Sequence, residues 1–399
     1  MKKRLSWYLF FFFVSHAAMA QHPQKFDSLY KTIFAKDLCE LAEQNPGIVL
    51  LDVRSAGEYS DTSQYNSLNM GHLKGAINME IDTMKKNPAI LDQFRDKTLI
   101  VYCSHSQRSR RVSKLLAENG FSNFYNLNGG MSHLNQMTTD EFPCKKEWIV
   151  SGLGYKNVSN AEAVDMLKSE PDLVVVDIRP ELQFVSKDSA AENNIGRVRG
   201  AINIPYANLK QRLSELEKHK QKPILLYVAS GDGDAARAAT ELASAGFTSV
   251  YHLLGGLNDL VASDENLNFL EPSLPFKIVN PVRALKLLKN ESNLAIYDTR
   301  PASEFENRDK LSWKNLGNIR NAINVAEKDF EHYSLPTDKA LPILVYGRGE
   351  AYQFAGMLAK KGYKKVYLMN GLYDFFWSSY NVEECRDAKK FLVNHAGIY

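Results

Sequence analysis

The sequence lacks the features that mark nucleic-acid-binding, membrane-spanning and metal-binding proteins. Without its first 20 residues the chain has 46 basic and 46 acidic residues, so no net positive field attracts nucleic acid or an anionic membrane. Its most apolar stretch, Leu5–Val14, has ten residues, whereas a transmembrane helix needs about 20. No cluster of cysteine and histidine has zinc-binding spacing, and no glycine-rich nucleotide loop is present. We therefore expect no metal or other cofactor, no nucleic-acid partner and no membrane span.

The length and composition fit several ordinary globular domains. The chain has 399 residues, of which 44% are apolar and 24% are charged. These proportions exclude a disordered chain and a miniprotein that depends on disulfides. At roughly 100 to 200 residues per domain, the length predicts two to four domains.

The first 20 residues are typical of a secretory signal peptide. A basic start, MKKR, precedes the apolar stretch, and the small-residue sequence AMA follows it before Gln21. An amphipathic or buried first helix is the alternative, but the basic flank and the small-residue exit suit it poorly. We expect residues 1–20 to be removed and the mature chain to be exported, to the periplasm or the extracellular space.

Export would permit disulfides, and the chain has four cysteines. Four thiols allow three complete pairings, and the sequence does not choose between them. Cys39 and Cys144 lie near the two edges of one repeat, described below, and could pair there; the other two are Cys103 and Cys385. The sequence leaves the pairing open.

Three segments of the chain repeat one pattern. An apolar run ends in Asp, one residue and Arg in LLDVR (50–54), VVDIR (175–179) and IYDTR (296–300). In each copy Gly follows the Asp after 19 positions, and the last Asn of GAIN or NAIN follows it after 26. The three Asp residues lie 125 and 121 residues apart, which is the spacing of domains rather than of solenoid repeats. The sequence therefore predicts a triplicated domain.

Within each copy, strand patterns alternate with helix patterns. The short runs rich in Val, Ile, Leu and Tyr are apolar without alternation, which is typical of parallel strands buried on both faces. Helical patterns separate them, for example at 37–44 and 110–118, and Gly120, Gly246 and Gly362 end the later helix of each copy, where a left-handed residue is favoured. This order predicts an open α/β sheet whose ligand site lies beyond the carboxyl ends of the strands.

The segment after the expected strand 99–102 contains the candidate reactive residue. It has the sequence CSHSQRS, from Cys103 to Ser109, and a helix is expected to start at about Ser109. A short polar loop between a strand and a helix directs backbone N–H groups inward, and together with the helix N-terminus it favours an anion such as a thiolate. We interpret Cys103 as a reactive thiol supported by Arg108, with help from Arg110 or Arg111. A buried structural cysteine is the alternative.

The motifs LDVR, GHLKGAIN, YCSHSQRS and NLNGG together resemble the rhodanese-like domain, a family of sulfurtransferases. The resemblance covers nearly all of the mature chain as three tandem copies, at 29–142, 155–268 and 278–380. It implies an α/β fold in which each copy has an open five-stranded parallel sheet flanked by helices.

The resemblance also implies a mechanism and a set of site residues. The Cys103 thiolate would attack the outer sulfur of thiosulfate or another sulfane donor, hold it as a persulfide, and pass it to an acceptor such as a thiol, a protein or cyanide. Arg108 would hold the anionic donor, and the loop residues around the sulfur would be Ser104, His105, Ser106, Gln107 and Ser109. We expect Asp52 and Arg54 to support the site by pairing with each other or with nearby loops. Glu58 is expected to be a scaffold or surface acid.

Two details of the loop bear on the chemistry. Ser106 stands where many active members of the family have glycine, and this departure concerns efficiency more than the existence of activity. Cys103 and Arg108 form C-x4-R, whereas related phosphatases use C-x5-R to enclose phosphate, and Ser109 occupies the place of their arginine. Phosphatase activity is therefore the minor alternative.

The second and third copies lack the nucleophile. Val228 and Gly347 occupy the position of Cys103, and neither can form a thiolate. We expect one catalytic domain and two degenerate domains that brace the active cleft or present a binding surface. Two competing functions stay open: a noncatalytic binding or scaffold protein, and a thiol redox protein, although the sequence has no Cys-x-x-Cys pair.

Overall fold

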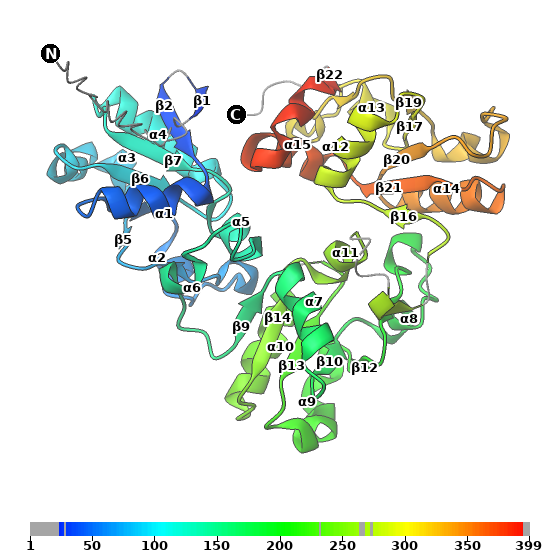
Figure 1. Ribbon diagram of the computed structural model, residues 1–399, viewed down its shortest axis with the longest axis horizontal. Coiled ribbons are helices and arrows are strands. Elements are labelled where there is room, and N and C mark those ends of the chain that lie inside the picture. Colours follow the sequence, from blue (N-terminus) through cyan, green and yellow to red (C-terminus); the bar gives the residue numbers. More distant parts are fainter. Residues whose placement is uncertain (1–23, 28, 231–232, 263–267, 272–273, 394–399) are drawn as a thin grey trace, which may run out of the picture.

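The chain folds into three α/β domains, which we number 1 to 3 along the sequence (Figure 1). The computed structural model describes residues 24–27, 29–230, 233–262, 268–271 and 274–393. The expected signal peptide, residues 1–20, lies outside the described residues. None of the helices within the described ranges has both the length and the apolar character of a membrane span.

Domain 1 is built on a sheet with the strand order β1-β2-β7-β6-β3-β5. Its strands are β1 (Gln24–Asp27), β2 (Tyr30–Ile33), β3 (Val49–Asp52), β5 (Ile77–Asn78), β6 (Leu99–Tyr102) and β7 (Phe124–Leu127). Its helices are α1 (Ala35–Gln44), α2 (Ala56–Tyr59), α3 (Ile81–Lys86), α4 (Gln107–Glu118) and α5 (Gly130–Gln136). Five strands are parallel, as expected, and β1 adds an antiparallel edge strand that the sequence did not predict.

Domains 2 and 3 repeat the five-stranded parallel sheet in the same order, β12-β10-β13-β14-β9 and β19-β17-β20-β21-β16. Domain 2 has strands β9 (Lys156–Val158), β10 (Val174–Asp177), β12 (Ile202–Asn203), β13 (Ile224–Tyr227) and β14 (Val250–Leu253), with helices α7 (Asn160–Ser169), α8 (Glu181–Phe184), α9 (Leu209–Arg212), α10 (Gly233–Ser244) and α11 (Gly256–Val261). Domain 3 has strands β16 (Lys277–Ile278), β17 (Ala295–Asp298), β19 (Ile323–Asn324), β20 (Ile343–Gly347) and β21 (Val366–Asn370), with helices α12 (Pro281–Asn290), α13 (Ala302–Phe305), α14 (Gly349–Lys360) and α15 (Tyr373–Asn381). The triplicated α/β fold is confirmed.

The segment after each sheet returns to pair with its own domain. Between the expected copies one and two, α6 (Lys145–Trp148) leads into β8 (Ile149–Val150), which pairs with β4 (His72–Leu73). Two further short antiparallel pairs join β11 (Arg197–Val198) to β15 (Leu270–Glu271) and β18 (Asn318–Ile319) to β22 (Leu392–Val393). These segments are therefore parts of the domains rather than free connections.

Local sequence accounts for where the helices begin and end. Ser159 and Glu162 form a capping box at the start of α7, with each side chain bonded to the other residue's backbone N–H. The glycines that follow α4, α10 and α14 have φ angles of 77°, 86° and 91°, the left-handed conformation that the sequence predicted there. Along β6 and β13 every residue is buried, as expected for central parallel strands.

The repeated Asp and Arg form a buried ion pair at the end of a central strand in each domain. In domain 1, Arg54 donates from Nε (3.0 Å) and Nη2 (2.8 Å) to the Asp52 carboxylate, and both side chains are fully buried. Arg54 Nη2 also donates to the Gly71 carbonyl, while Asn78 Nδ2 donates to the carbonyls of Asp52 and Arg54. The same bonds recur in domains 2 and 3. The glycine 19 residues after the Asp and the asparagine 26 residues after it thus make the same hydrogen bonds in all three domains.

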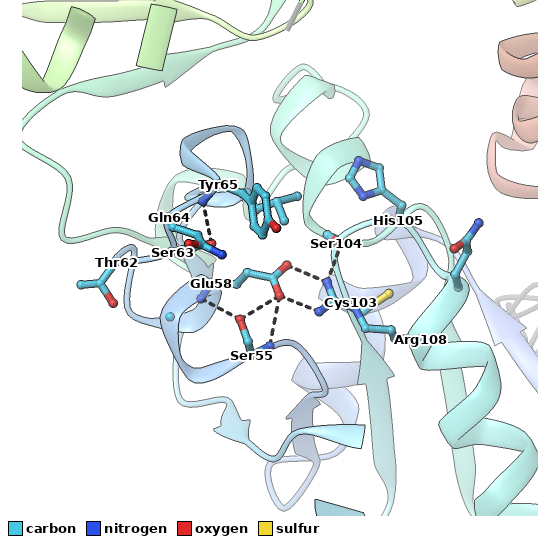
Figure 2. A pocket seen from close by; sticks show the side chains of 13 residues that line it. Ser55, Glu58, Thr62, Ser63, Gln64, Tyr65, Cys103, Ser104, His105 and Arg108 are labelled. Atoms are coloured by element: carbon cyan, nitrogen blue, oxygen red, sulfur yellow. Dashed lines mark hydrogen bonds and ion pairs between the residues drawn. The ribbon is translucent and has the colours of Figure 1, made fainter. Parts of the chain in front are cut away.

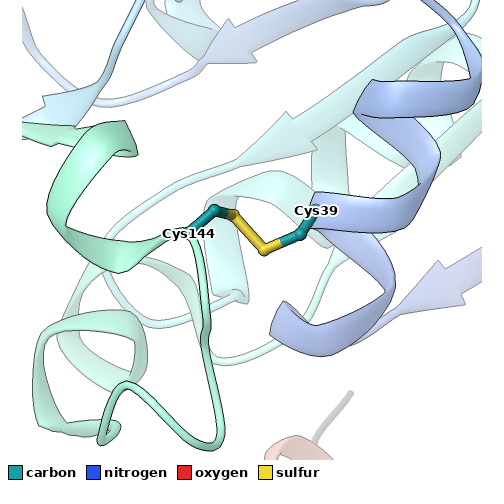
Figure 3. Close-up of a disulfide and its surroundings, with 2 residues drawn as sticks. All are labelled: Cys39 and Cys144. Atoms are coloured by element: carbon teal, nitrogen blue, oxygen red, sulfur yellow. A yellow bond between two sulfur atoms is a disulfide. The ribbon is translucent and has the colours of Figure 1, made fainter.

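Domain 1 is closed by a disulfide between Cys39 on α1 and Cys144, the residue before α6 (Figure 3). The bond joins positions 105 residues apart in the sequence. Cys103 and Cys385 are free and buried. The structure therefore selects the pairing that the sequence could only suggest.

Removing this cross-link should loosen domain 1 selectively. In the C39S/C144S variant we expect a loss of about 2 to 5 kcal/mol in the free energy of unfolding of domain 1, because the unfolded chain regains its freedom. Hydrogen exchange followed by mass spectrometry would show faster exchange in domain 1 peptides, with domains 2 and 3 as the internal control. Dithiothreitol should have the same effect on the wild type and none on the variant. Uniform loosening of all three domains would contradict the prediction.

Candidate functional site

Cys103 lies at the carboxyl end of β6, where the fold directs a ligand (Figure 2). Its side chain is a free thiol, and the residue is only 1% exposed, yet it lines a cavity of about 770 Å³. The cavity is lined by Ser55, Gly57, Glu58, Thr62, Ser63, Gln64, Tyr65, Leu68, Cys103, Ser104, His105, Gln107 and Arg108. The predicted nucleophile is therefore not cross-linked and borders a space that can hold a substrate.

The start of α5 fixes the backbone of the loop. The carbonyl of Cys103 accepts from the Met131 N–H (2.9 Å), and that of Ser104 accepts from the Ser132 N–H (3.0 Å). Gly130 has φ +60°, and a side chain there would lie 2.2 Å from the Cys103 carbonyl oxygen. Glycine is therefore required at this close approach.

Within the part of the chain that the structure describes, the N–H groups of residues 104–109 donate no hydrogen bond, and the Cys103 Sγ accepts none. The expected stabilisation of the thiolate by these amides stays a prediction. They form a set of unbonded donors at the start of α4, suited to a second sulfur or to an anion placed beyond Sγ.

Ser106 adopts the backbone conformation that a glycine would adopt freely. Its φ is +68°, in the left-handed region. Hydrogen bonds hold it there: Ser106 Oγ accepts from the Gly129 N–H (2.6 Å), and its carbonyl accepts from the Arg110 N–H (3.0 Å) and from Ser109 Oγ (3.1 Å). The chain therefore keeps the loop angle without the glycine, and α4 begins at Gln107 rather than at about Ser109.

Some polar side chains of the loop are hydrogen-bonded within the protein, and others border the cavity. The hydroxyls of Ser106 and Ser109 are engaged in the bonds just described instead of pointing to the sulfur, and Ser104 Oγ accepts from Arg108 Nη2 (2.8 Å). His105 and Gln107 have exposed side chains that border the cavity. Direct contact of these five residues with a substrate stays a prediction, carried mainly by their backbone N–H groups.

Arg108 is held by an acid that sequence reasoning did not assign to the site. Its Nη1 and Nη2 donate to the Glu58 carboxylate at 2.5 and 2.6 Å (Figure 2). Glu58 is 3% exposed, so the expectation of a surface acid is wrong and that of a scaffold acid is closer. Burial alone would raise the pKa of Glu58, but the bonds and charge of Arg108 outweigh burial and lower the pKa below its ordinary value. The carboxylate is therefore ionised at neutral pH.

The start of α2 fixes the Glu58 carboxylate in this position. Glu58 Oε2 accepts from the N–H and the hydroxyl of Ser55, and Ser55 Oγ accepts from the Glu58 N–H. This capping box places Glu58 one helical turn after the buried Asp52–Arg54 pair. Asp52 and Arg54 thus pair with each other, and their charges also act on Arg108 and Glu58.

Arg110 joins the loop that follows Cys103 to domain 3. Its Nη2 donates to the oxygen atoms of Asn128 (3.0 Å), Tyr380 (3.1 Å) and Asn381 (3.0 Å), of which the last two lie at the end of α15. Help from Arg110 or Arg111 to the thiolate stays a prediction. No pattern in the sequence indicates this contact.

The degenerate domains keep the frame of the loop without its nucleophile. In domain 2 the Val228 carbonyl accepts from the start of α11 as the Cys103 carbonyl does from α5, although residues 231–232 of that loop lie outside the described residues. In domain 3, Arg348 Nη1 donates to Glu304 (2.9 Å), six residues after Asp298, as Glu58 is six residues after Asp52. The acid–arginine pair thus occurs even where no thiol is present.

Comparison with known proteins identifies the family. The family profile described as "Rhodanese-like domain" matches residues 35–136, 159–263 and 281–377. These three matches cover most of the chain and coincide with the three sheets. The chain belongs to the rhodanese-like domain family.

Individual relatives resemble only parts of the chain or share low identity with it. The thiosulfate sulfurtransferase GlpE of Shewanella oneidensis is 29% identical over 105 residues, which are 26% of this chain and 92% of GlpE. The tRNA uridine(34) hydroxylase of Pectobacterium carotovorum is 27% identical over 106 residues, which are 25% of this chain, and the match spans about a quarter (27%) of the hydroxylase. Among solved structures, wild-type EanB is 18% identical with a TM-score of 0.26, over 89% of this chain and 97% of EanB.

Two substitutions at Ser106 should separate backbone strain from hydrogen bonding. Ser106→Ala keeps the left-handed angle but leaves the buried Gly129 N–H unbonded, at a cost of about 1 to 3 kcal/mol. Ser106→Gly loses the same bond but relieves the angle, which should recover about 1 kcal/mol. Hydrogen exchange of peptides that cover the loop and α4 should therefore rank wild type, S106G and S106A in order of falling protection. Lower protection in S106G than in S106A would contradict this account.

Proposed function

We propose that the protein is an exported sulfurtransferase that carries sulfane sulfur as a persulfide on Cys103. The observation that carries the proposal is the free Cys103 thiol at the base of a cavity, next to the unbonded amides at the start of α4. Similarity to GlpE, whose name describes a thiosulfate sulfurtransferase, supports sulfur-transfer chemistry.

The proposed reaction has two steps at one sulfur atom. The Cys103 thiolate bonds to the outer sulfur of the donor, the donor's own bond to that sulfur breaks, and the leaving group takes the electron pair. An acceptor thiolate then attacks the outer sulfur of the persulfide and releases Cys103 as a thiolate. The loop amides would bind the transferred sulfur, and α5 would keep the loop rigid through the carbonyls of Cys103 and Ser104.

The Cys39–Cys144 disulfide supports the proposed export, because such bonds persist in oxidising compartments. In that setting the catalytic thiol must avoid a permanent cross-link. Cys385, the other free cysteine, is fully buried in domain 3 and does not border the Cys103 cavity. The arrangement supports one oxidised structural pair together with one thiol kept for chemistry.

Mass spectrometry of the intact protein tests the proposal. After incubation with a sulfane donor the protein should gain one sulfur, and Cys103→Ser should gain none because the attacking atom is gone. Cys385→Ser is the matched control and should gain sulfur as the wild type does. No gain with any donor, together with no thiocyanate formed from cyanide, would favour a noncatalytic scaffold. Hydrolysis of an aryl phosphate that depends on Cys103 would favour a phosphatase instead.

A further inference from the structure

The Cys103 cavity has no uncompensated positive charge. Among the described residues that line it, Arg108 is the only lysine or arginine, and the Glu58 carboxylate balances that charge. Partial desolvation at the cavity wall, and after it the Arg108 charge, hold the pKa of His105 below its ordinary value, so the imidazole is neutral at neutral pH. A dianion that approaches the Cys103 thiolate therefore meets negative charge without a free cation to offset it.

The pairing of Glu58 with Arg108 is built into the fold. Glu58 is nearly fully buried and is also bonded to Ser55. Its carboxylate therefore cannot move with the Arg108 side chain if that side chain turns towards a ligand. If Arg108 turned to a ligand, a buried carboxylate would lose its partner, which is strongly unfavourable. In domain 3, Glu304, the counterpart of Glu58, is also paired, with Arg348 and Lys314, although Arg348 lies at a different position of its loop from Arg108.

We infer that Glu58 determines donor specificity: by occupying Arg108 it disfavours small dianions such as thiosulfate and favours an organic persulfide with little net charge. This inference rests on the proposed function. The cavity, at about 770 Å³, is within the range that accommodates whole organic ligands. Leu68 and Tyr65, the latter labelled in Figure 2, give its wall apolar surface for a carbon-bearing group. A small inorganic anion would leave most of that space unused.

The transfer from such a donor balances without a further reactant. The Cys103 thiolate bonds to the terminal sulfur of R–S–SH, and the S–S bond of the donor breaks. The R–S⁻ group leaves with the electron pair, and the proton stays on the transferred sulfur. The thiolate and the neutral persulfide together carry a charge of minus one throughout this transfer. The thiolate and thiosulfate together carry a charge of minus three before sulfite departs.

The test compares two donors on the same protein preparations. The probes are thiosulfate and 2-hydroxyethyl persulfide, generated from bis(2-hydroxyethyl) disulfide and sulfide, and the readout is the rate of sulfur gain on Cys103. The variant is Glu58→Gln, which removes the charge but can still accept from Ser55. The matched control is Glu304→Gln, which makes the same change in the domain without a nucleophile. The ratio of the two rates within each preparation is insensitive to any misfolded fraction.

We expect the wild type to react faster with the organic persulfide than with thiosulfate. Glu58→Gln should shift the ratio towards thiosulfate by about tenfold or more, the scale of freeing one charge that faces a dianion. Glu304→Gln should leave the ratio unchanged. A wild type that prefers thiosulfate, or a ratio that Glu58→Gln does not move, would overturn the donor inference while leaving the sulfurtransferase in place. No sulfur gain from either donor would overturn both.

Discussion

The buried pair of Asp52 and Arg54 is the interaction on which the site depends. The pair lies at the end of strand β3, and Arg54 also donates to the Gly71 carbonyl. The Asn78 side-chain amide donates to the backbone carbonyls of Asp52 and Arg54, so three segments of the chain are bonded together here. Separating a buried pair of this kind typically costs about 3 to 5 kcal/mol, because one charge is left unpaired. The helix α2 starts directly after it, and α2 places Glu58 against Arg108.

The loop that follows Cys103 is held from three directions. The start of α5 bonds the carbonyls of Cys103 and Ser104, Glu58 holds Arg108, and domain 3 holds Arg110 through the end of α15. Elsewhere, turns of one domain pack against the corresponding helix of the next: the turn Asn66–Leu68 contacts α10, and Ala191–Asn193 contacts α14. Domain 2 therefore contacts both of its neighbours, and domain 3 contacts the loop that carries the thiol.

Much of this could be predicted from the sequence because the decisive signals are local and repeated. Three equal spacings from Asp to Gly and Asn indicate the triplicated fold, and the strand–loop–helix pattern places Cys103 at its ligand-binding edge. The contacts of the loop could not be predicted, because they depend on tertiary structure. Arg108 and Glu58 are 50 residues apart, and Arg110 and Asn381 are 271 apart. One signal was available: an acid stands six residues after Asp52 and after Asp298, in the two copies that have an arginine within five residues of the position of Cys103.

A single reactive sulfur in the first of three similar domains is the central claim of this account. Peptide mapping of the donor-treated protein, before and after an acceptor thiol is added, tests it most directly. The account predicts one extra sulfur on the peptide that contains Cys103, none on the peptide that contains Cys385, and loss of the extra sulfur when the acceptor is added. Sulfur found on Cys385, or sulfur that stays on Cys103 in the presence of acceptors, would contradict it.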